Sequence, residues 1–256
     1  MIMKKIYFFL VALMLTLSAG AQTLRGDVNG DGVVNIGDVT DLVNIILYGD
    51  EGEDPDTPVV PEEPATDSRA INLGLSVKWA SCNVGATAPE EYGGYYAWGE
   101  TNEKSDYSWS TYKYCNGSDT SMTKYCTNSS YGTVDNKTIL EPGDDVAHVQ
   151  WGGSWRMPTL DEIKELYNNC TWQWTTLNGV TGYRVTGPNG NSIFLPAAGY
   201  SYRTGVYSQG ADGGFWSSSL ASDGSGLAYS LYFGSSYYDW DDLYRYGGLP
   251  VRPVCE

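Results

Sequence analysis

The chain has 256 residues, of which 15 are Lys or Arg and 31 are Asp or Glu, so its formal net charge is −16. Nucleic acids and anionic lipids are bound mainly through clustered Lys and Arg side chains, and a chain this acidic repels them. The composition therefore excludes a nucleic-acid partner and leaves many carboxylates for solubility and for binding hard cations.

Residues 1–21 have the features of a secretory signal peptide. Lysines at positions 4 and 5 precede an apolar run over 6–17, and the small residues at 19–21 precede Gln22, where we expect cleavage. The apolar run is too short to cross a bilayer of about 30 Å, and no cysteine follows the cleavage point to accept a lipid. We predict an exported protein, secreted or at the cell surface, with the periplasm as the alternative and no membrane insertion after cleavage.

The segment 24–48 contains oxygen-bearing side chains at alternating positions. A loop that begins at residue 27 places them at positions 1, 3, 5, 9 and 12, with a turn glycine at 6 and a backbone carbonyl at 7. Calcium takes about six to eight oxygen ligands, and a loop wound around the ion presents them with this spacing. The predicted calcium ligands are Asp27, Asn29, Asp31, the carbonyl of Val33, Asn35 and Asp38.

An apolar helical stripe at positions 39, 42, 43 and 46 follows the loop, but cleavage leaves no room for a helix before it. A calcium loop with only its exiting helix resembles a single type I dockerin repeat. The resemblance implies docking to a cohesin-like module, although dockerins normally carry two repeats. Ile36 and Gly37 also stand where many dockerins have small hydroxyl residues. Two interpretations stay open: cohesin docking, or a calcium-stiffened cap that packs on its own protein or on a second copy.

The segment 49–68 is rich in carboxylates and contains four prolines. We predict an extended, acidic linker there, because such a segment has little apolar surface to bury. Residues 70–256 are rich in Gly, Tyr, Trp and Ser and have the length of one domain.

Within this domain, short apolar runs separated by Gly and Asn predict strands, and two segments predict helices. Thr159 and Glu162 form a predicted capping box for a helix over 160–169, and a second helix is expected near 144–151. The predicted strands lie at 71–73, 76–79, 182–186, 192–195, 227–233 and 251–254, with a hairpin turn at Asn189-Gly190. The fold class is therefore α+β with long loops.

Five cysteines occur in a chain expected in an oxidising compartment. Cys115 and Cys126 are close in sequence and flank a Gly/Ser/Thr-rich stretch, so they are the candidate pair for a disulfide. The sequence leaves other pairings open.

Several motifs of the large domain, taken together, resemble one family. They are Leu-Gly-Leu-Ser-Val-Lys-Trp-Ala-Ser-Cys-Asn-Val-Gly-Ala at 73–86, Tyr-Ala-Trp-Gly-Glu at 96–100, Trp-Gly-Gly-Ser-Trp-Arg-Met-Pro-Thr at 151–159, Phe-Trp-Ser-Ser-Ser at 215–219 and Val-Arg-Pro-Val at 251–254. They resemble the Fibrobacter succinogenes major paralogous (FISUMP) domain of exported proteins of Bacteroidota and Fibrobacterota. That family is similar in turn to C-type-lectin-like domains. The resemblance implies paired terminal strands, two helices and long loops that display a binding face.

Two arginines and three tryptophans of these motifs are expected to serve the fold. Arg156 and Arg252 are predicted to be buried and to hold loops through paired hydrogen bonds. Trp151, Trp155 and Trp216 are predicted core residues.

The segment 198–248 contains nine tyrosines among many Ser and Gly residues. Tyr provides contact area at low entropic cost and Ser and Gly adapt to the ligand, as in evolved recognition surfaces. In variable C-type-lectin-like proteins the diversified positions lie just ahead of a terminal strand, where 235–246 lies here. We expect 235–246 to be an acidic loop, with a second calcium site as the less favoured interpretation. The predicted ligand-binding residues are Tyr202, Tyr207, Ser236, Tyr237, Tyr238, Asp239, Trp240, Asp241, Asp242 and Tyr244.

Catalytic motifs are weak in this sequence. The single histidine, His148, falls on a predicted helix with no nucleophile at a recognisable spacing, and only Cys255 lies where related sulfatase-modifying enzymes use a cysteine pair. A carboxylate-pair glycosidase is the enzyme class left open. We predict a non-enzymatic, calcium-binding protein whose large domain recognises a glycan or a surface protein. The alternative is a dockerin-mediated component of an extracellular polysaccharide-degrading or scaffold assembly.

Overall fold

The computed structural model describes residues 67–256 and, ahead of them, only the isolated positions Val34 and Val39. The predicted signal peptide and calcium ligands, and all of the predicted linker before Asp67, lie outside the described residues. Asp67 belongs to the folded domain, because its carboxylate accepts a hydrogen bond from Trp155 Nε1 at 2.9 Å and pairs with Arg69 Nη2 at 2.5 Å. Within the part of the chain that the structure describes, no helix is long and apolar enough to cross a membrane.

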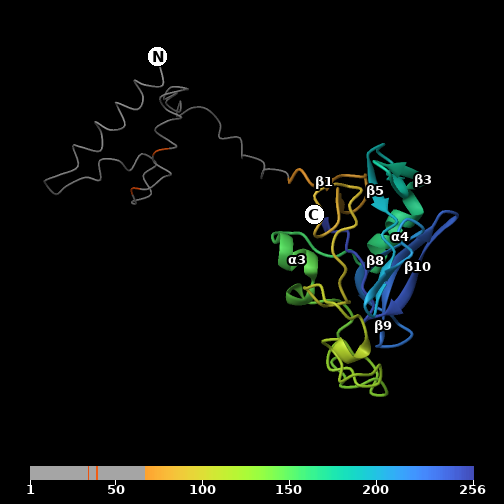
Figure 1. Ribbon diagram of the computed structural model, residues 1–256. Helices are drawn as coiled ribbons and strands as arrows, with labels where there is room; N and C mark the ends of the chain where they lie inside the picture. The colour runs from red at the N-terminus through yellow and green to blue at the C-terminus, as the bar shows by residue number, and fades with distance from the viewer. Residues whose placement is uncertain (1–33, 35–38, 40–66) are drawn as a thin grey trace, which may run out of the picture. The chain divides into compact units, whose positions relative to one another are not determined.

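The domain is a sheet-dominated α+β fold, as the sequence predicts (Figure 1). The described residues form three three-stranded sheets, in the orders β1-β2-β11, β10-β9-β8 and β3-β4-β5, and a β6-β7 hairpin. The strands are β1 (Ala70–Ile71), β2 (Lys78–Ala80), β3 (Thr171–Leu177), β4 (Val180–Thr186), β5 (Ser192–Pro196), β6 (Tyr200–Tyr202), β7 (Gly205–Tyr207), β8 (Asp212–Leu220), β9 (Leu227–Gly234), β10 (Tyr237–Tyr244) and β11 (Val254–Cys255). The helices are α3 (Val146–Trp151) and α4 (Leu160–Asn169), with short 3-10 helices η1 (Trp109–Thr111) and η2 (Pro142–Asp144).

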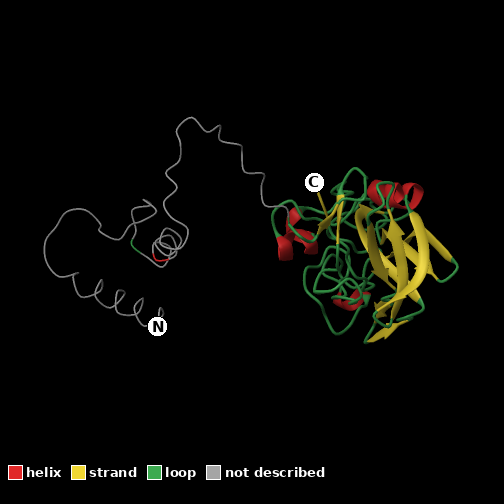
Figure 2. Cartoon of the chain, turned by 90° about the horizontal axis from the view of Figure 1, so that it is seen from above, coloured by secondary structure: helices red, strands yellow, loops and turns green. Residues whose placement is uncertain are grey.

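The strands gather on one side of the domain and the long loops on the other (Figure 2). The small sheet β1-β2-β11 joins the beginning of the domain to the end of the chain, with Trp79 opposite Val254. Of the predicted strand at 251–254, only Val254 lies in a named strand. The residues before it form an extended segment that still bonds to its neighbours, for example through Val84 N to Val251 O at 3.0 Å.

Helix α4 begins and ends where the sequence predicts. Thr159 Oγ1 accepts a hydrogen bond from Glu162 N at 3.3 Å, and Glu162 Oε2 accepts one from Thr159 N at 2.7 Å, which completes the capping box. Ile163 and Leu166 are buried against the apolar residues of β4, β5, β8 and β9. The helix therefore covers one face of the β8-β9-β10 sheet.

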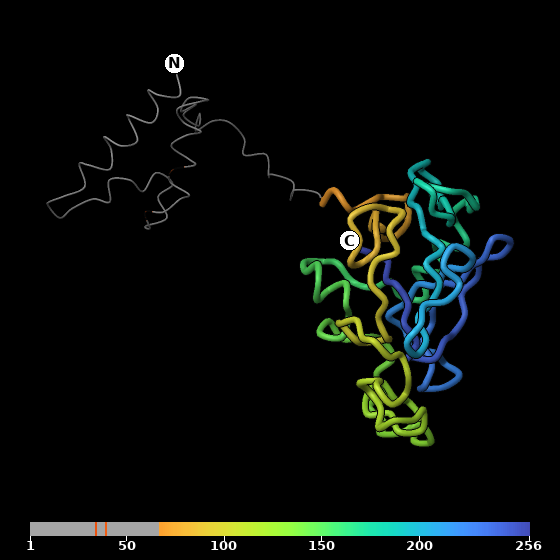
Figure 3. Tube along the Cα trace, in the orientation of Figure 1, coloured from red at the N-terminus to blue at the C-terminus, as the bar shows by residue number. Residues whose placement is uncertain are grey.

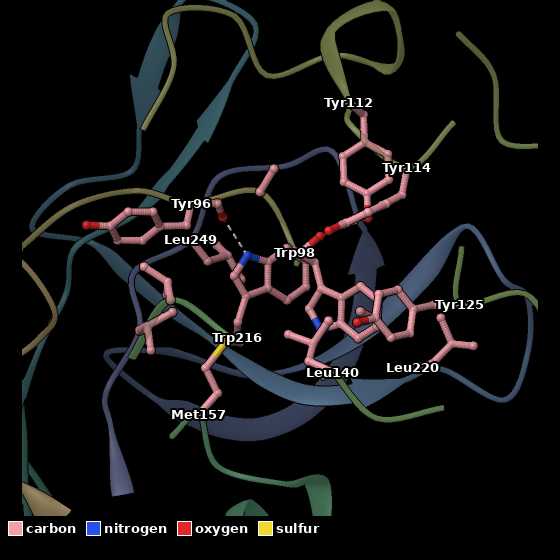
Figure 4. Close-up of a cluster of buried hydrophobic side chains, with 14 of the residues drawn as sticks. Tyr96, Trp98, Tyr112, Tyr114, Tyr125, Leu140, Met157, Trp216, Leu220 and Leu249 are labelled. Carbon is pink, nitrogen blue, oxygen red and sulfur yellow. Dashed lines mark hydrogen bonds between the residues drawn. The ribbon is translucent and has the colours of Figure 1, made fainter. Parts of the chain in front are cut away.

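The loops between β2 and α3, whose course Figure 3 shows, enclose a second core, and its side chains are mainly aromatic (Figure 4). Trp98 and Trp216 are completely buried, and Trp216 Nε1 donates to Tyr96 O at 2.7 Å. Trp98 meets the ring of Tyr125 edge to face at 5.2 Å, a favourable geometry for aromatic pairs. Trp155 is also buried, as predicted, whereas Trp151 is only half-buried.

Arg252 is completely buried, as predicted, and holds three segments together. Its guanidinium donates to Asn83 Oδ1 at 2.7 Å, to the carbonyl of Ala80 at 3.0 Å and to that of Phe194 at 2.9 Å. Burial lowers the pKa of Arg252 to about 9. Arg156, which was also predicted to be buried, is half-buried instead, and its guanidinium donates two hydrogen bonds to the Glu162 carboxylate at the start of α4.

The predicted disulfide between Cys115 and Cys126 is absent, and all five cysteines are free thiols. Cys115 Sγ lies 3.2 Å from the carbonyl oxygen of Trp109, whereas Cys126 Sγ lies 3.2 Å from that of Asn128. The two thiols thus face different carbonyl groups, and the loop between them is held by backbone hydrogen bonds such as Met122 N to Tyr131 O at 2.7 Å.

A buried carboxylate, Asp144, organises the loops around the aromatic core. It accepts hydrogen bonds from the Tyr114 hydroxyl, from the Tyr125 hydroxyl at 2.7 Å and from Lys124 Nζ at 2.5 Å. Burial disfavours the charged form, but these hydrogen bonds and the charge of Lys124 outweigh that effect and lower the pKa of Asp144 to about 2.

This lowered pKa makes the stability of the domain dependent on pH. The folded protein holds Asp144 charged below its ordinary pKa of 3.8, so the stabilisation is complete above that pH and is lost as the pH falls toward 2. We expect Asp144→Asn to lower the free energy of unfolding by about 2–3 kcal/mol at neutral pH and to flatten its decline below pH 4, as measured by urea denaturation. Asp161→Asn, at an exposed position of α4, is the matched control. An unchanged acid profile in Asp144→Asn would contradict this account.

Candidate ligand-binding cleft

Residues 237–244, predicted as an acidic loop, form strand β10 instead. β10 pairs with β9 along its whole length, from Tyr237 opposite Gly234 to Tyr244 opposite Leu227. The alternation of aromatic and acidic residues suits a strand with two different faces, and aromatic side chains favour strands through cross-strand packing. The turn between the two strands contains Ser236.

Neighbouring residues of β10 face opposite sides of the sheet. Tyr238 faces the apolar core and stacks on Trp172, with ring centroids 4.6 Å apart and planes 12° apart. Trp240 lies on the same side, where Lys164 of α4 places its Nζ 4.2 Å from the ring centroid. These two predicted ligand residues therefore support the fold, and the structure excludes them from a shared binding surface with Tyr237.

The other face of this sheet carries a cleft of about 240 Å³. Its walls come from β8, β9 and β10, from the start of β6 and from the segment after β10. The lining residues are Gly199, Tyr200, Asp212, Gly213, Gly214, Ser230, Tyr232, Asp241, Asp242, Leu243 and Leu249.

Tyr200 and Tyr232 form the aromatic part of the cleft, and each packs against a second tyrosine. The Tyr232 and Tyr237 rings lie 5.5 Å apart, and the Tyr237 hydroxyl donates to Tyr232 Oη at 2.9 Å and lies 3.3 Å from Asp212 Oδ1. The hydrogen bond to Tyr232, burial and the charge of Asp212 raise the pKa of Tyr237, so its hydroxyl stays protonated. In the β6-β7 hairpin, Tyr200 stacks on Tyr207 at 5.8 Å.

A glycine keeps the floor of the cleft open. A Cβ atom at Gly214 would lie 2.9 Å from Leu249 Cδ2, which also lines the cleft. Gly214 is opposite Tyr232 in the sheet, so the missing side chain leaves space beside an aromatic ring. The cleft thus combines apolar walls with a few polar groups, which is typical of small-ligand and sugar sites.

The structure brings only part of the predicted ligand set to this cleft. Asp241 and Asp242 line it, Tyr237 borders it through Tyr232, and Tyr207 supports Tyr200. Asp239 is opposite Tyr232 and shares its face, whereas Ser236 lies in the turn.

Tyr202 and Tyr244 belong to a separate aromatic group. Tyr246 contacts both, at centroid distances of 6.0 and 5.6 Å, and Trp109 lies 4.7 Å from Tyr246. The exposed tyrosines of the predicted binding face are therefore divided between the cleft and this second group.

Sequence reasoning missed Tyr200, Tyr232, Asp212 and Ser230 of the cleft. The available signal was the two-residue period in β9, where Ser230 and Tyr232 alternate with the buried Leu231 and Phe233. The pairing of β9 with both β8 and β10 then brings Asp212 and Asp241 to the same face, and this register is not apparent from residue types alone.

No histidine or cysteine is among the residues that line the cleft. His148 lies in α3, away from the cleft lining, and its Nδ1 is 3.3 Å from the carbonyl oxygen of Trp155. Within residues 67–256, no group of three or more His, Cys, Asp or Glu side chains is arranged to hold a metal ion. Comparisons with protein-family models, curated proteins and solved structures found no match.

The two faces of β10 predict losses of stability of different size for adjacent tyrosines. Tyr238→Ala removes a stacked, half-buried ring and is expected to lower the free energy of unfolding by about 2–3 kcal/mol. Tyr237→Ala removes an exposed ring and one hydrogen-bonding hydroxyl, with an expected loss of about 1 kcal/mol or less. Urea denaturation of both variants measures the difference, and equal losses would contradict the assignment of the two faces.

Proposed function

We propose that the chain is an exported, non-enzymatic binding protein whose large domain recognises a glycan in the cleft on the β8-β9-β10 sheet. The observation that carries this proposal is the grouping of Tyr200 and Tyr232 with the carboxylates of Asp212 and Asp241 around an open glycine floor. A pyranose ring presents an apolar face to an aromatic ring and hydroxyl groups to carboxylates, which accept hydrogen bonds only.

The same geometry favours a glycan over a flat protein interface. The cleft is concave and small, about 240 Å³, and suits one or two sugar rings better than the broad contact area of a stable protein complex. A surface protein remains the second class of ligand in the proposal, and binding to it would use the exposed tyrosines around the cleft.

We further propose a C-type-lectin-like fold of the FISUMP type for residues 70–256. The pairing of β2 with β11, the two α-helices and the long loops support it, since these are the features that the resemblance implies. The motif before α4 also has a clear task, because Arg156 and Thr159 both bind Glu162.

Binding to an array of glycans and surface proteins tests the function. We expect the mature chain to bind a glycan, and Tyr232→Ala to weaken that binding at least about tenfold, the effect of losing an aromatic contact of about 1.4 kcal/mol. Tyr202→Ala is the comparison variant, because Tyr202 is equally exposed and belongs to the second aromatic group. Loss of binding in Tyr202→Ala alone would move the site to that group, and binding to no glycan would refute the proposal.

We propose in addition that residues 24–48 bind calcium through the loop that begins at Asp27. The spacing of its oxygen-bearing side chains supports this proposal. The alternative function, a dockerin-mediated component of an extracellular polysaccharide-degrading assembly, depends on the same loop, because a cohesin-like module would recognise the calcium-bound form.

Calcium titration of the mature chain by calorimetry tests the loop. Asp31→Ala removes one carboxylate ligand and is expected to weaken calcium binding at least about tenfold, whereas Asp41→Ala, which lies beyond the loop, is expected to leave it unchanged. Equal affinities of the wild type and Asp31→Ala would refute the site. Capture by a cohesin module that disappears in Asp31→Ala would favour the assembly function.

A further inference from the structure

The carboxylates around the cleft have no cationic partner within the domain. Asp212, Asp241 and Asp242 line the cleft, the side chains of Asp212 and Asp241 share the face of Tyr232, and no lining residue is basic. None of the ion pairs within residues 67–256 involves these three carboxylates. The nearby cations serve other contacts, since Lys164 lies over Trp240 on the opposite face of the sheet and Arg203 over Tyr202.

The neighbouring charges of Asp241 and Asp242 disfavour each other. Asp242 is half-buried, and burial together with the charges of Asp241 and Asp223 raises its pKa. Asp212 is half-buried as well, and its carboxylate lies 3.3 Å from the Tyr237 hydroxyl. A positive charge placed in the cleft would relieve this repulsion, whereas an anionic ligand would increase it.

Protection of the sheet edge explains only part of this charge. β10 is an edge strand, and carboxylates on an edge strand oppose pairing with another chain. Asp212, however, lies on β8, whose outer side is already bonded to other segments, for example through Trp216 N to Pro250 O at 3.2 Å. Its position at the cleft therefore requires another reason.

The aromatic walls add a second attraction for a cation. The rings of Tyr200 and Tyr232 both line the cleft, and the face of a tyrosine ring attracts an ammonium group at close range. The same rings can stack on the apolar face of a sugar. A ligand that joins a pyranose ring to an ammonium group would satisfy both the aromatic and the acidic sides of this cleft.

We propose that the cleft binds an amino sugar with a free, protonated amine, as found in glucosamine oligomers. The inference rests on the proposed glycan-binding function and names its ligand class. An ammonium group lies beside Asp212 or beside Asp241, while a sugar ring packs on Tyr232, which lies between these two carboxylates in the strand register. N-acetylated sugars lack the charge, and uronic or sulfated sugars are repelled.

Calorimetry with three probes tests this inference: the hexamers of glucosamine, N-acetylglucosamine and galacturonic acid. At pH 6 and low salt, we expect the mature chain to bind the glucosamine hexamer at least about tenfold more tightly than the N-acetylglucosamine hexamer, and not to bind the galacturonic acid hexamer. Binding of the glucosamine hexamer should weaken with added salt and with rising pH, as the ligand amine loses its proton.

Variants separate the charge effect from the aromatic one. Asp212→Asn and Asp241→Asn preserve side-chain size and are expected to reduce the preference for glucosamine over N-acetylglucosamine several-fold. Asp161→Asn removes an equal charge from α4, on the other side of the sheet, and should leave the preference unchanged. Urea denaturation of each variant verifies that the domain is folded.

The outcomes distinguish this inference from the function on which it depends. If the glucosamine and N-acetylglucosamine hexamers bind equally tightly, and Tyr232→Ala binds neither, the amino-sugar inference is overturned and the glycan function stays in place. Binding to poly-L-lysine but to none of the three hexamers would overturn both, because the cleft would then recognise a basic peptide. Binding to none of these probes would overturn the amino-sugar inference.

Discussion

The domain depends on two guanidinium groups, those of Arg245 and Arg252, which are completely buried without a carboxylate partner in the described chain. A buried charge is costly unless hydrogen bonds surround it, and here backbone carbonyls accept most of them. The carbonyls that accept from Arg245 are in loops, whereas those that accept from Arg252 belong to Ala80 in β2 and Phe194 in β5. Arg245 donates to the carbonyls of Lys124, Tyr125 and Ser225 at 3.1, 3.1 and 2.7 Å. Loops with few ladder hydrogen bonds need such donors for their buried carbonyls, and Arg245 supplies them, whereas Arg252 ties β2 to β5.

The same constraint positions the cleft. The chain between Arg245 and Arg252 runs through the middle of the domain and bonds to the loops on one side and to β8 on the other. Leu249 of this segment lies on the cleft floor, and its backbone exchanges hydrogen bonds with Tyr96 at 3.0 and 3.1 Å. Gly248 bonds in the same way to Ser201, which fixes the β6-β7 hairpin and its tyrosines. Rigid support of this kind holds a binding site in a defined geometry before the ligand arrives.

Structural elements that depend mainly on residues close to them in the sequence were predictable from the sequence. Helix α4 carries its own capping box and apolar stripe. Arg252 is the only residue of its Val-Arg-Pro-Val motif with a side-chain hydrogen-bond donor, so its role in binding neighbouring segments was expected. The Asn189-Gly190 turn was also found, although the connection spans residues 187–191 and Gly190 adopts φ +88°. Strand β10 was missed because its acidic residues suggest a loop, and it forms a strand only through its pairing with β9. Only part of the cleft was predicted, for the same reason: its residues come from β8, β9 and β10, and only the pairing of these strands brings them to one face.

The alternation along β10 separates the proposed binding face from the face that packs on the core. Tyr238 and Trp240 are held by core aromatics and by Lys164, so a change at either position affects packing. Tyr237, Asp239 and Asp241 point to the other face, where they are exposed and meet the cleft or its border. Substitutions at these odd-numbered positions can alter the ligand at little cost in stability. A diversified binding face on this strand is therefore expected to vary with a two-residue period, and not over a continuous segment.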